Sequence, residues 1–206
     1  MLLVDLSGNN WPVVNSRRDF ERLRAAGVRG ALVKATEGAS FVNERFRAYR
    51  RWALAVGMLV GPYHFAYPTG GDAQEEAEHF IRTVGRLDQL RPALDMEIDP
   101  GELRAKLTAW SRSWNQAVLA GLKSEPLFYS YPYFIRYMRP RTPIGSGLWL
   151  ASYGPNDGKR HPYVVPSPWK RAVMHQYTSV GRIGGIYPLD LNYAAGLQPL
   201  LAFPAV

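Results

Sequence analysis

The sequence contains no cysteine among its 206 residues. A disulfide framework, a thiol nucleophile and a thiolate zinc site are therefore excluded. The sequence also lacks a long hydrophobic run, because the apolar start of the chain stops at the acidic Asp5 and has no basic residue before it. We therefore expect no membrane insertion, and a protein made in the cytoplasm without a signal peptide.

The short motifs of several large enzyme classes are missing as well. No phosphate-loop G-x-x-x-x-G-K-[S/T], dinucleotide-binding G-x-G-x-x-G, zincin H-E-x-x-H or serine-hydrolase G-x-S-x-G pattern occurs. The four histidines are far apart in the sequence. Because buried structural histidines are commoner than metal ligands, we interpret His64 and His175 as structural and expect no cofactor and no metal ion.

Acidic residues are fewer than basic ones, with 17 Asp plus Glu against 25 Lys plus Arg and a formal net charge of +8. This charge favours a polyanionic partner, either nucleic acid or an acidic polymer. The basic residues are dispersed, and the densest groups lie within residues 45–51 and 136–141. We interpret these groups mainly as solvated surface and expect no specific binding of nucleic acid.

Short apolar runs alternate with segments of helical period, which is typical of βα units around a parallel sheet. After Tyr131 the helical pattern fades. We therefore predict an α/β fold of one domain over residues 1–206, an irregular TIM-like barrel with five βα units followed by three further strands. The strands are expected at Leu2–Leu6, Ala31–Ala35, Met58–Phe65, Ala93–Ile98, Leu127–Tyr131, Leu148–Ser152, Ala172–Tyr177 and Leu189–Asn192. The helices are expected at Ser16–Ala26, Asn43–Val56, Asp72–Val84, Gly101–Gly121 and Tyr131–Met138, with Ser16, Asn43 and Asp72 as N-terminal caps.

Four acidic residues interrupt these apolar strands. In the run Ala93–Ile98, Asp95 and Glu97 share one face, about 6.6 Å apart along the strand, because side chains alternate. Asp5 in L-L-V-D-L-S and Asp190 in Y-P-L-D-L-N are embedded in the same way. Buried acids in such strands are costly unless they lie at the carboxyl end of the sheet, where ligands bind. The sequence therefore predicts a site built from four carboxylates.

Paired carboxylates are what the cleavage of a glycosidic bond requires, one protonated to donate to the leaving oxygen and one ionised. Aromatic residues lie near the ends of the predicted strands, as they do in many sugar-binding grooves. The aromatic candidates are Tyr63, Phe65, Tyr129, Trp149 and Tyr153.

Seven short motifs follow one another along almost the whole chain. They are V-D-L-S (Val4–Ser7), K-A-T-E-G (Lys34–Gly38), G-P-Y-H-F (Gly61–Phe65), L-D-M-E (Leu94–Glu97), L-W-L-A-S-Y (Leu148–Tyr153), H-Q-Y-T-S (His175–Ser179) and L-D-L-N (Leu189–Asn192). This ordered set resembles the family 25 glycoside hydrolases, lysozymes made by some bacteria, fungi and phages. The sequence departs from the family at Asn10, where Gln is common, and at Pro188–Leu189, which replaces a small residue and Val.

The resemblance implies a muramidase that cleaves the β-1,4 bond between N-acetylmuramic acid and N-acetylglucosamine in peptidoglycan. It implies Glu97 as the general acid and Asp95 as its partner, and it matches Asp5 and Asp190 to the other two acids of the groove. Tyr63, Trp149, Gln176 and Tyr177 fall in its substrate-contact motifs. We accordingly expect a monomer of phage or prophage endolysin type, acting on the glycan strands of the bacterial cell wall.

Several alternatives remain open at this point. Direct displacement, inversion and assistance by the acetamido group of the substrate all fit the spacing of the acids. Among these we favour assistance, with Glu97 donating the proton and Asp95 orienting the acetamido group. The competing functions are a chitinase-like hexosaminidase of family 18, a sugar-binding barrel without catalysis and a nucleic-acid binder.

Overall fold

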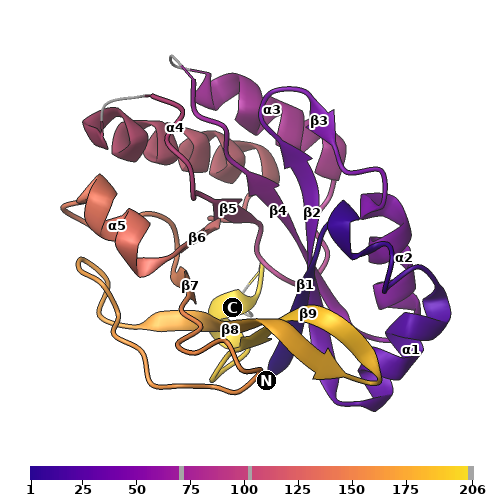
Figure 1. Cartoon of the computed structure of the whole chain (residues 1–206). Helices are drawn as coiled ribbons and strands as arrows, with labels where there is room; N and C mark the ends of the chain where they lie inside the picture. The colour runs from indigo at the N-terminus through magenta and orange to yellow at the C-terminus, as the bar shows by residue number, and fades with distance from the viewer. Residues whose placement is uncertain (70–71, 102–103, 204–206) are drawn as a thin grey trace.

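The computed structural model describes residues 1–69, 72–101 and 104–203 (Figure 1). Its strands form one sheet in the order β1-β9-β8-β7-β6-β5-β4-β2-β3, and an additional pairing of β1 with β2 closes the barrel. The strands are β1 (Leu2–Leu6), β2 (Val28–Glu37), β3 (Phe41–Val42), β4 (Leu59–Phe65), β5 (Ala93–Asp95), β6 (Leu127–Ser130), β7 (Leu148–Ala151), β8 (Ala172–Ile183) and β9 (Ile186–Tyr193). The α-helices are α1 (Arg17–Ala25), α2 (Phe46–Ala55), α3 (Ala73–Val84), α4 (Arg104–Leu122) and α5 (Pro132–Met138), and two short 3-10 helices lie at Gly8–Asn10 and Gln198–Leu200.

The predicted architecture of five βα units followed by three strands is confirmed. Strands β1, β2, β4, β5 and β6 are each followed by a helix, whereas β7, β8 and β9 follow one another with loops alone. The purple half of the molecule in Figure 1 is covered by helices, and the orange and yellow third is not. Strand β9 runs antiparallel to both neighbours, β8 and β1, so its first residues lie at the carboxyl ends of the parallel strands.

Two groups of buried apolar side chains divide the core. One group, the inner core, fills the barrel and includes Leu3, Leu32, Ala93 and Leu127. The larger group, the outer core, lies on the other face of the same strands and packs against the helices, with residues such as Val4. Because side chains alternate along a strand, the inner group and its neighbours two positions onward share the barrel lumen. The functional candidates therefore sort by whether they point inward or outward.

Several predicted boundaries are wrong. Strand β5 ends at Asp95 rather than Ile98, and just beyond this end the Met96 carbonyl accepts the Ser130 hydroxyl. Helix α2 begins at Phe46 rather than Asn43. The buried Asn43 donates to the Lys34 carbonyl at 2.7 Å and so fastens the turn to β2.

Smaller differences concern other elements. Ser16 and Asp72 occupy the N-cap positions of α1 and α3 as predicted, and the predicted helix Gly101–Gly121 is described from Arg104 onward. Residues 102–103 of that prediction lie outside the described residues. The two-residue strand β3 was not predicted. Within the described residues, no helix is both long enough and apolar enough to cross a membrane.

His64 lies in the outer layer, where it is fully buried. Its Nδ1 lies 2.8 Å from the Thr36 hydroxyl and its Nε2 lies 2.7 Å from the Glu76 carboxylate. Burial lowers the pKa of His64 to about 3 and raises that of Glu76 to about 8. The same Glu76 oxygen accepts the Tyr67 N–H at 3.1 Å, so this buried network fastens the segment that leaves β4.

Candidate active site

The four predicted acids meet at one end of the barrel. Asp5 in β1 is the register partner of Asp190 in β9. Asp95, the last residue of β5, is paired with Phe65 on one side and Tyr129 on the other. Glu97 follows two positions later, where its charge acts on Asp95. The carboxyl ends of the parallel strands therefore bring together acids that are far apart in the sequence.

Asp5 accepts hydrogen bonds from two side-chain amides of the protein. Its Oδ2 accepts the side-chain amide of Gln176 at 2.9 Å and that of Asn192 at 2.7 Å. Gln176 and Asn192 are register partners on β8 and β9, which places both amides beside β1. Hydrogen bonds to the charged form of a carboxyl group favour ionisation. The two amides therefore favour the ionised form of Asp5.

Aromatic side chains fix the orientation of both amides. The Trp149 indole donates to Asn192 Oδ1 at 2.7 Å, and an indole N–H has no acceptor capacity. The hydroxyls of Tyr129 and Tyr153 both donate to Gln176 Oε1, at 2.8 and 2.6 Å. Each amide oxygen is thus occupied, and each amide nitrogen is turned toward Asp5.

Burial raises the pKa values of all four acids, and repulsion by neighbouring carboxylates adds to it for Asp95, Glu97 and Asp190. Burial raises the pKa of Asp5 to about 6, against the two amide hydrogen bonds that lower it. Burial and then the Asp5 charge raise the pKa of Asp190 to about 8. Burial, Glu97 and Asp5 hold the pKa of Asp95 well above its usual value. At neutral pH Asp5 is therefore mostly ionised, whereas Asp190 retains its proton.

Glu97 has a raised pKa for related reasons. Burial is the largest cause and the negative charge of Asp5 adds to it, whereas the positive charge of Lys34 lowers the pKa. A carboxyl group whose pKa is raised toward neutrality retains a proton that it can donate. The arrangement thus combines a proton donor with a fixed nearby charge.

Lys34 belongs to the site although it was not among the predicted site residues. Its ammonium group lies 2.5 Å from Glu37 Oε2 and 4.6 Å from the centre of the Phe65 ring. Its charge lowers the pKa of both Asp95 and Glu97. The sequence contained the same indication for Lys34 as for the acids, namely a charged residue inside an apolar strand. Asn192 was also missed, and its only signal was its position two residues after Asp190.

The predicted substrate residues divide by strand face. Tyr63, Tyr129 and Trp149 belong to the inner core, and the Trp149 ring contacts Tyr129 at 4.5 Å and Tyr63 at 6.1 Å between ring centroids. Phe65, Tyr153 and Gln176 also lie with the acids, through the contacts given above. Tyr177 instead belongs to the outer core, beside His175 at 6.2 Å between ring centroids. Six of these seven residues are brought together, and Tyr177 is not.

Solved structures with this architecture include a bacterial lysozyme from Streptomyces coelicolor, with a TM-score of 0.83 and 24% identity over 95% of this chain and 92% of that chain. The catalytic domain of the endolysin ply40 from bacteriophage P40 of Listeria monocytogenes aligns with a TM-score of 0.77 and 24% identity, covering 95% of this chain and 93% of that chain. These similarities establish the fold.

Relatives in sequence are similar over most of the chain. An autolytic lysozyme of Clostridium acetobutylicum is 27% identical over 82% of this chain, which spans 49% of that relative. The uncharacterized protein YegX of Escherichia coli K12 is 31% identical over 91% of this chain and 69% of its own length. The chain thus spans about half the length of the first of these relatives. Residues 9–186 match the glycosyl hydrolases family 25, and the chain belongs to this family.

Proposed function

We propose that the protein is a muramidase, a peptidoglycan hydrolase that cleaves the β-1,4 bond between N-acetylmuramic acid and N-acetylglucosamine. The observation that carries the proposal is the Asp5 carboxyl group, held by two oriented amides, beside the acids Asp95, Glu97 and Asp190. The residues form a single catalytic domain in this proposal. It acts as a monomer on the glycan strands of the bacterial cell wall.

Glu97 is the general acid of the proposed reaction. Burial and the Asp5 charge raise its pKa, which favours the protonated form that a general acid requires. It delivers this proton to the glycosidic oxygen as the bond to C1 breaks, which avoids the release of an alkoxide. The resulting Glu97 carboxylate then takes a proton from the attacking water in the second half of the reaction.

Asp95 acts on the acetamido group of the sugar whose C1 is attacked. The carbonyl oxygen of that group forms a bond to C1 while the bond to the leaving oxygen breaks, and water later opens the ring that results. Asp95 accepts the acetamido N–H and stabilises the positive charge that develops on the amide. Its Oδ1 has no hydrogen-bond partner among the described residues, which supports a role for this carboxyl group toward a donor from outside the protein.

The other residues of the site form the proposed groove around these two acids. Trp149 is 1% exposed, so we propose that it supports the groove from below rather than stacking directly on a sugar. Tyr153 and Phe65 are half-buried and offer ring surface beside the acids. Asp190 sits opposite Asp5 and is held mostly protonated, where it donates a hydrogen bond to a sugar hydroxyl.

The experiment that tests the proposal is a digest of purified peptidoglycan by wild type, Glu97→Gln and the control Glu75→Gln, an exposed glutamate on α3. Fragments are reduced with borohydride and identified by mass spectrometry. We expect reduced muramic acid ends from wild type and control and none from Glu97→Gln. Reduced glucosamine ends would assign a different bond. Binding of the wall without cleavage by any of the three proteins would indicate a sugar-binding barrel.

A second readout addresses the mechanism. Assistance by the acetamido group retains the configuration at C1, so the first product detected by NMR is the β-anomer. An α-anomer as the first product would exclude this route. A covalent glycosyl adduct on Asp95 would exclude it as well, because that carboxylate would then be the nucleophile.

A further inference from the structure

A strongly basic cleft lies between α4 and α5. Its volume is about 610 Å³, and it is lined by Arg104, Thr108, Arg112, Tyr137, Met138, Arg139, Arg141 and Thr142. Four of these eight residues are arginines, and none of the described lining residues is acidic. Clefts of this volume are large enough to hold a ligand of several functional groups.

Two of the four guanidinium groups of the cleft contact neutral partners. Arg112 donates to the Thr142 carbonyl at 2.8 Å, the Thr142 hydroxyl at 2.7 Å and the Pro143 carbonyl at 3.2 Å. Arg104 lies over the Tyr137 ring, with 5.5 Å between its Cζ and the ring centre. None of the four arginines forms an ion pair with a described carboxylate. The positive charge of the cleft is therefore not neutralised by these residues.

Two tyrosines of the α5 segment connect the cleft to the loop that follows β5 and contains Glu97 and Asp99. The Tyr137 hydroxyl donates to Asp99, two residues beyond Glu97. At the start of the helix, the Tyr131 hydroxyl lies 3.4 Å from the Glu97 carbonyl oxygen. Figure 1 shows α5 beside α4, directly after β6. A ligand in the cleft would lie on the flank of the site that we propose for the glycan.

We propose that the cleft binds a phosphodiester polymer of the cell wall, such as a chain of glycerol phosphate units. The planar guanidinium group matches the geometry of phosphate and forms paired hydrogen bonds with it. Four arginines in a cleft with no acid among its described lining residues suit a ligand that repeats its negative charge, because a single anion neutralises only part of the cleft. The choice of a wall polymer rests on the proposed function, since such a polymer lies beside the glycan that the enzyme cleaves.

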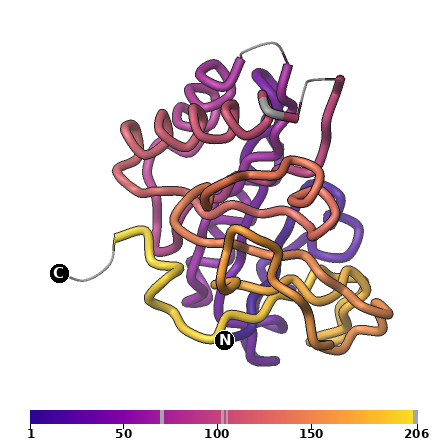
Figure 2. Tube along the Cα trace, turned by 90° about the vertical axis from the view of Figure 1, so that its left-hand side faces the viewer, coloured from indigo at the N-terminus to yellow at the C-terminus, as the bar shows by residue number. Residues whose placement is uncertain are grey.

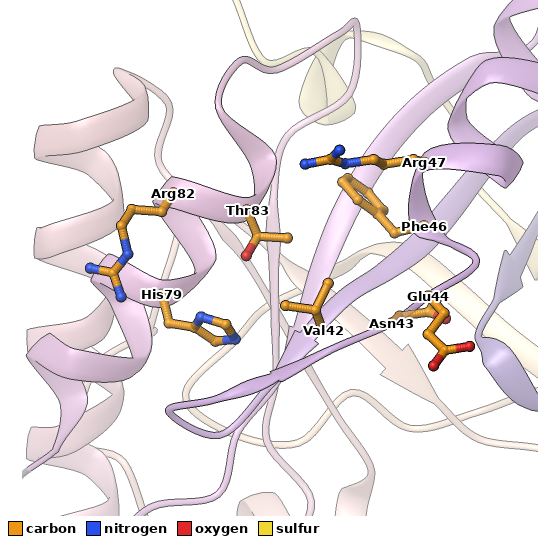
Figure 3. Close-up of a pocket in the computed structure, with 8 residues that line it drawn as sticks. All are labelled: Val42, Asn43, Glu44, Phe46, Arg47, His79, Arg82 and Thr83. Atoms are coloured by element: carbon orange, nitrogen blue, oxygen red, sulfur yellow. The ribbon is translucent and has the colours of Figure 1, made fainter.

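A second hollow supplies a matched control (Figure 3). It has a volume of about 400 Å³ and is lined by Val42, Asn43, Glu44, Phe46, Arg47, His79, Arg82 and Thr83. In Figure 3, Arg47 extends from α2, while Arg82 and His79 extend from α3. Glu44 lines this hollow, and Arg82 lies 3.7 Å from Glu78. The positive charge of the hollow is therefore partly balanced.

The test is fluorescence anisotropy with labelled poly(glycerol phosphate) over a salt series. Arg139→Gln/Arg141→Gln and the control Arg47→Gln/Arg82→Gln each reduce the net charge from +8 to +6, because each pair removes two positive charges. We expect the first pair to weaken binding by about tenfold and to reduce the slope of log K against log salt by about 1.4, as for two lost contacts to a single-stranded polyanion. The control pair should bind within about twofold of wild type.

Equal weakening in both variants would overturn the proposal, because it would show attraction by net charge alone. Tighter binding of single-stranded RNA than of the polymer would overturn the choice of ligand. Thermal melting of both variants checks their folding, and Arg104→Gln/Arg141→Gln replaces the first pair if its melting differs. The probe contains no glycan, so its binding is independent of whether the protein hydrolyses peptidoglycan.

Discussion

The indole of Trp149 donates to Asn192 Oδ1 at 2.7 Å and thereby determines which atom of that amide faces Asp5. An asparagine side chain can present either an acceptor or a donor to its neighbour. Because the indole only donates, the oxygen of the amide is occupied and the nitrogen points to Asp5 at 2.7 Å. The tryptophan thus favours the ionised form of a carboxyl group through an intermediate residue.

Replacing Asn192 with alanine should shift the acid limb of activity. The variant loses a hydrogen bond that lowers the pKa of Asp5, so that pKa rises and Asp5 ionises only at higher pH. We expect the acid limb of kcat/KM to move up by about one pH unit, since one charge-assisted hydrogen bond is worth about that much. The measurement is the pH profile of peptidoglycan hydrolysis. Asn115→Ala, a buried asparagine on α4, is the control and should leave the limb in place.

Replacing Lys34 with glutamine should move the opposite limb. The Lys34 charge lowers the pKa of Glu97, so its removal raises that pKa and keeps the proposed general acid protonated to higher pH. We expect the basic limb of kcat to move up by roughly half a unit to one unit. The exposed Lys170→Gln provides the control for loss of one positive charge. A basic limb that moves to lower pH would contradict the assigned electrostatic effect.

Replacing Asp190 with asparagine should change the pH dependence of stability. The pKa of Asp190 is raised from 3.8 to about 8 in the folded protein. The folded state therefore keeps a proton that the unfolded chain releases, so stability is full below the unfolded pKa and is lost as the pH rises through about 8. Asparagine carries no such proton.

Thermal melting from acidic to mildly alkaline pH measures this effect. We expect Asp190→Asn to lose less stability than wild type between about pH 5 and about pH 8. Glu75→Gln, on an exposed face of α3, should follow the wild-type curve. Parallel curves for wild type and Asp190→Asn would show that the acid is already ionised in the folded protein.

Replacing Gly61 with alanine should destabilise the barrel. A Cβ at this position in β4 would lie 2.8 Å from Leu90 Cβ and 2.9 Å from the Arg91 carbonyl oxygen. Because one of these atoms is backbone, relief requires a shift of the chain, which costs about 1 to 3 kcal/mol. Urea unfolding measures the loss. Gly196→Ala is the control, since its Cβ would meet nothing closer than Pro199 at 3.9 Å, and we expect a change within about 0.5 kcal/mol.

The acids could be predicted from the sequence because a charged residue inside an apolar strand is costly. That argument located Asp5, Asp95 and Asp190 without knowledge of their neighbours. The end of β5 could not be predicted, because the alternation of side chains continues through Glu97 and Ile98 while the ladder does not. The roles of Gln176 and Asn192 as paired donors depend on the register between β8 and β9, which contains several shifts.

The sequence alone also could not show which side chains of β8 face the site. Gln176 and Tyr177 are adjacent in the same motif, yet they face opposite sides of the sheet, toward the acids and toward the outer core. A motif identifies both residues equally well. To tell them apart, one must know which side chains of β8 point into the barrel. This follows from the pairing of the strands in the closed sheet.

The antiparallel β9 closes the barrel against β1, and the Met1 amino group bonds to the Ala194 carbonyl at 2.6 Å. Figures 1 and 2 both show the start of the chain beside this last strand. Asn192 and its acceptor Asp5 are separated by 187 positions in the sequence. During translation, the growing chain therefore carries Asp5 long before it contains the amide partner. The two amide hydrogen bonds that hold the Asp5 carboxyl group are therefore both in place only after β9 has left the ribosome.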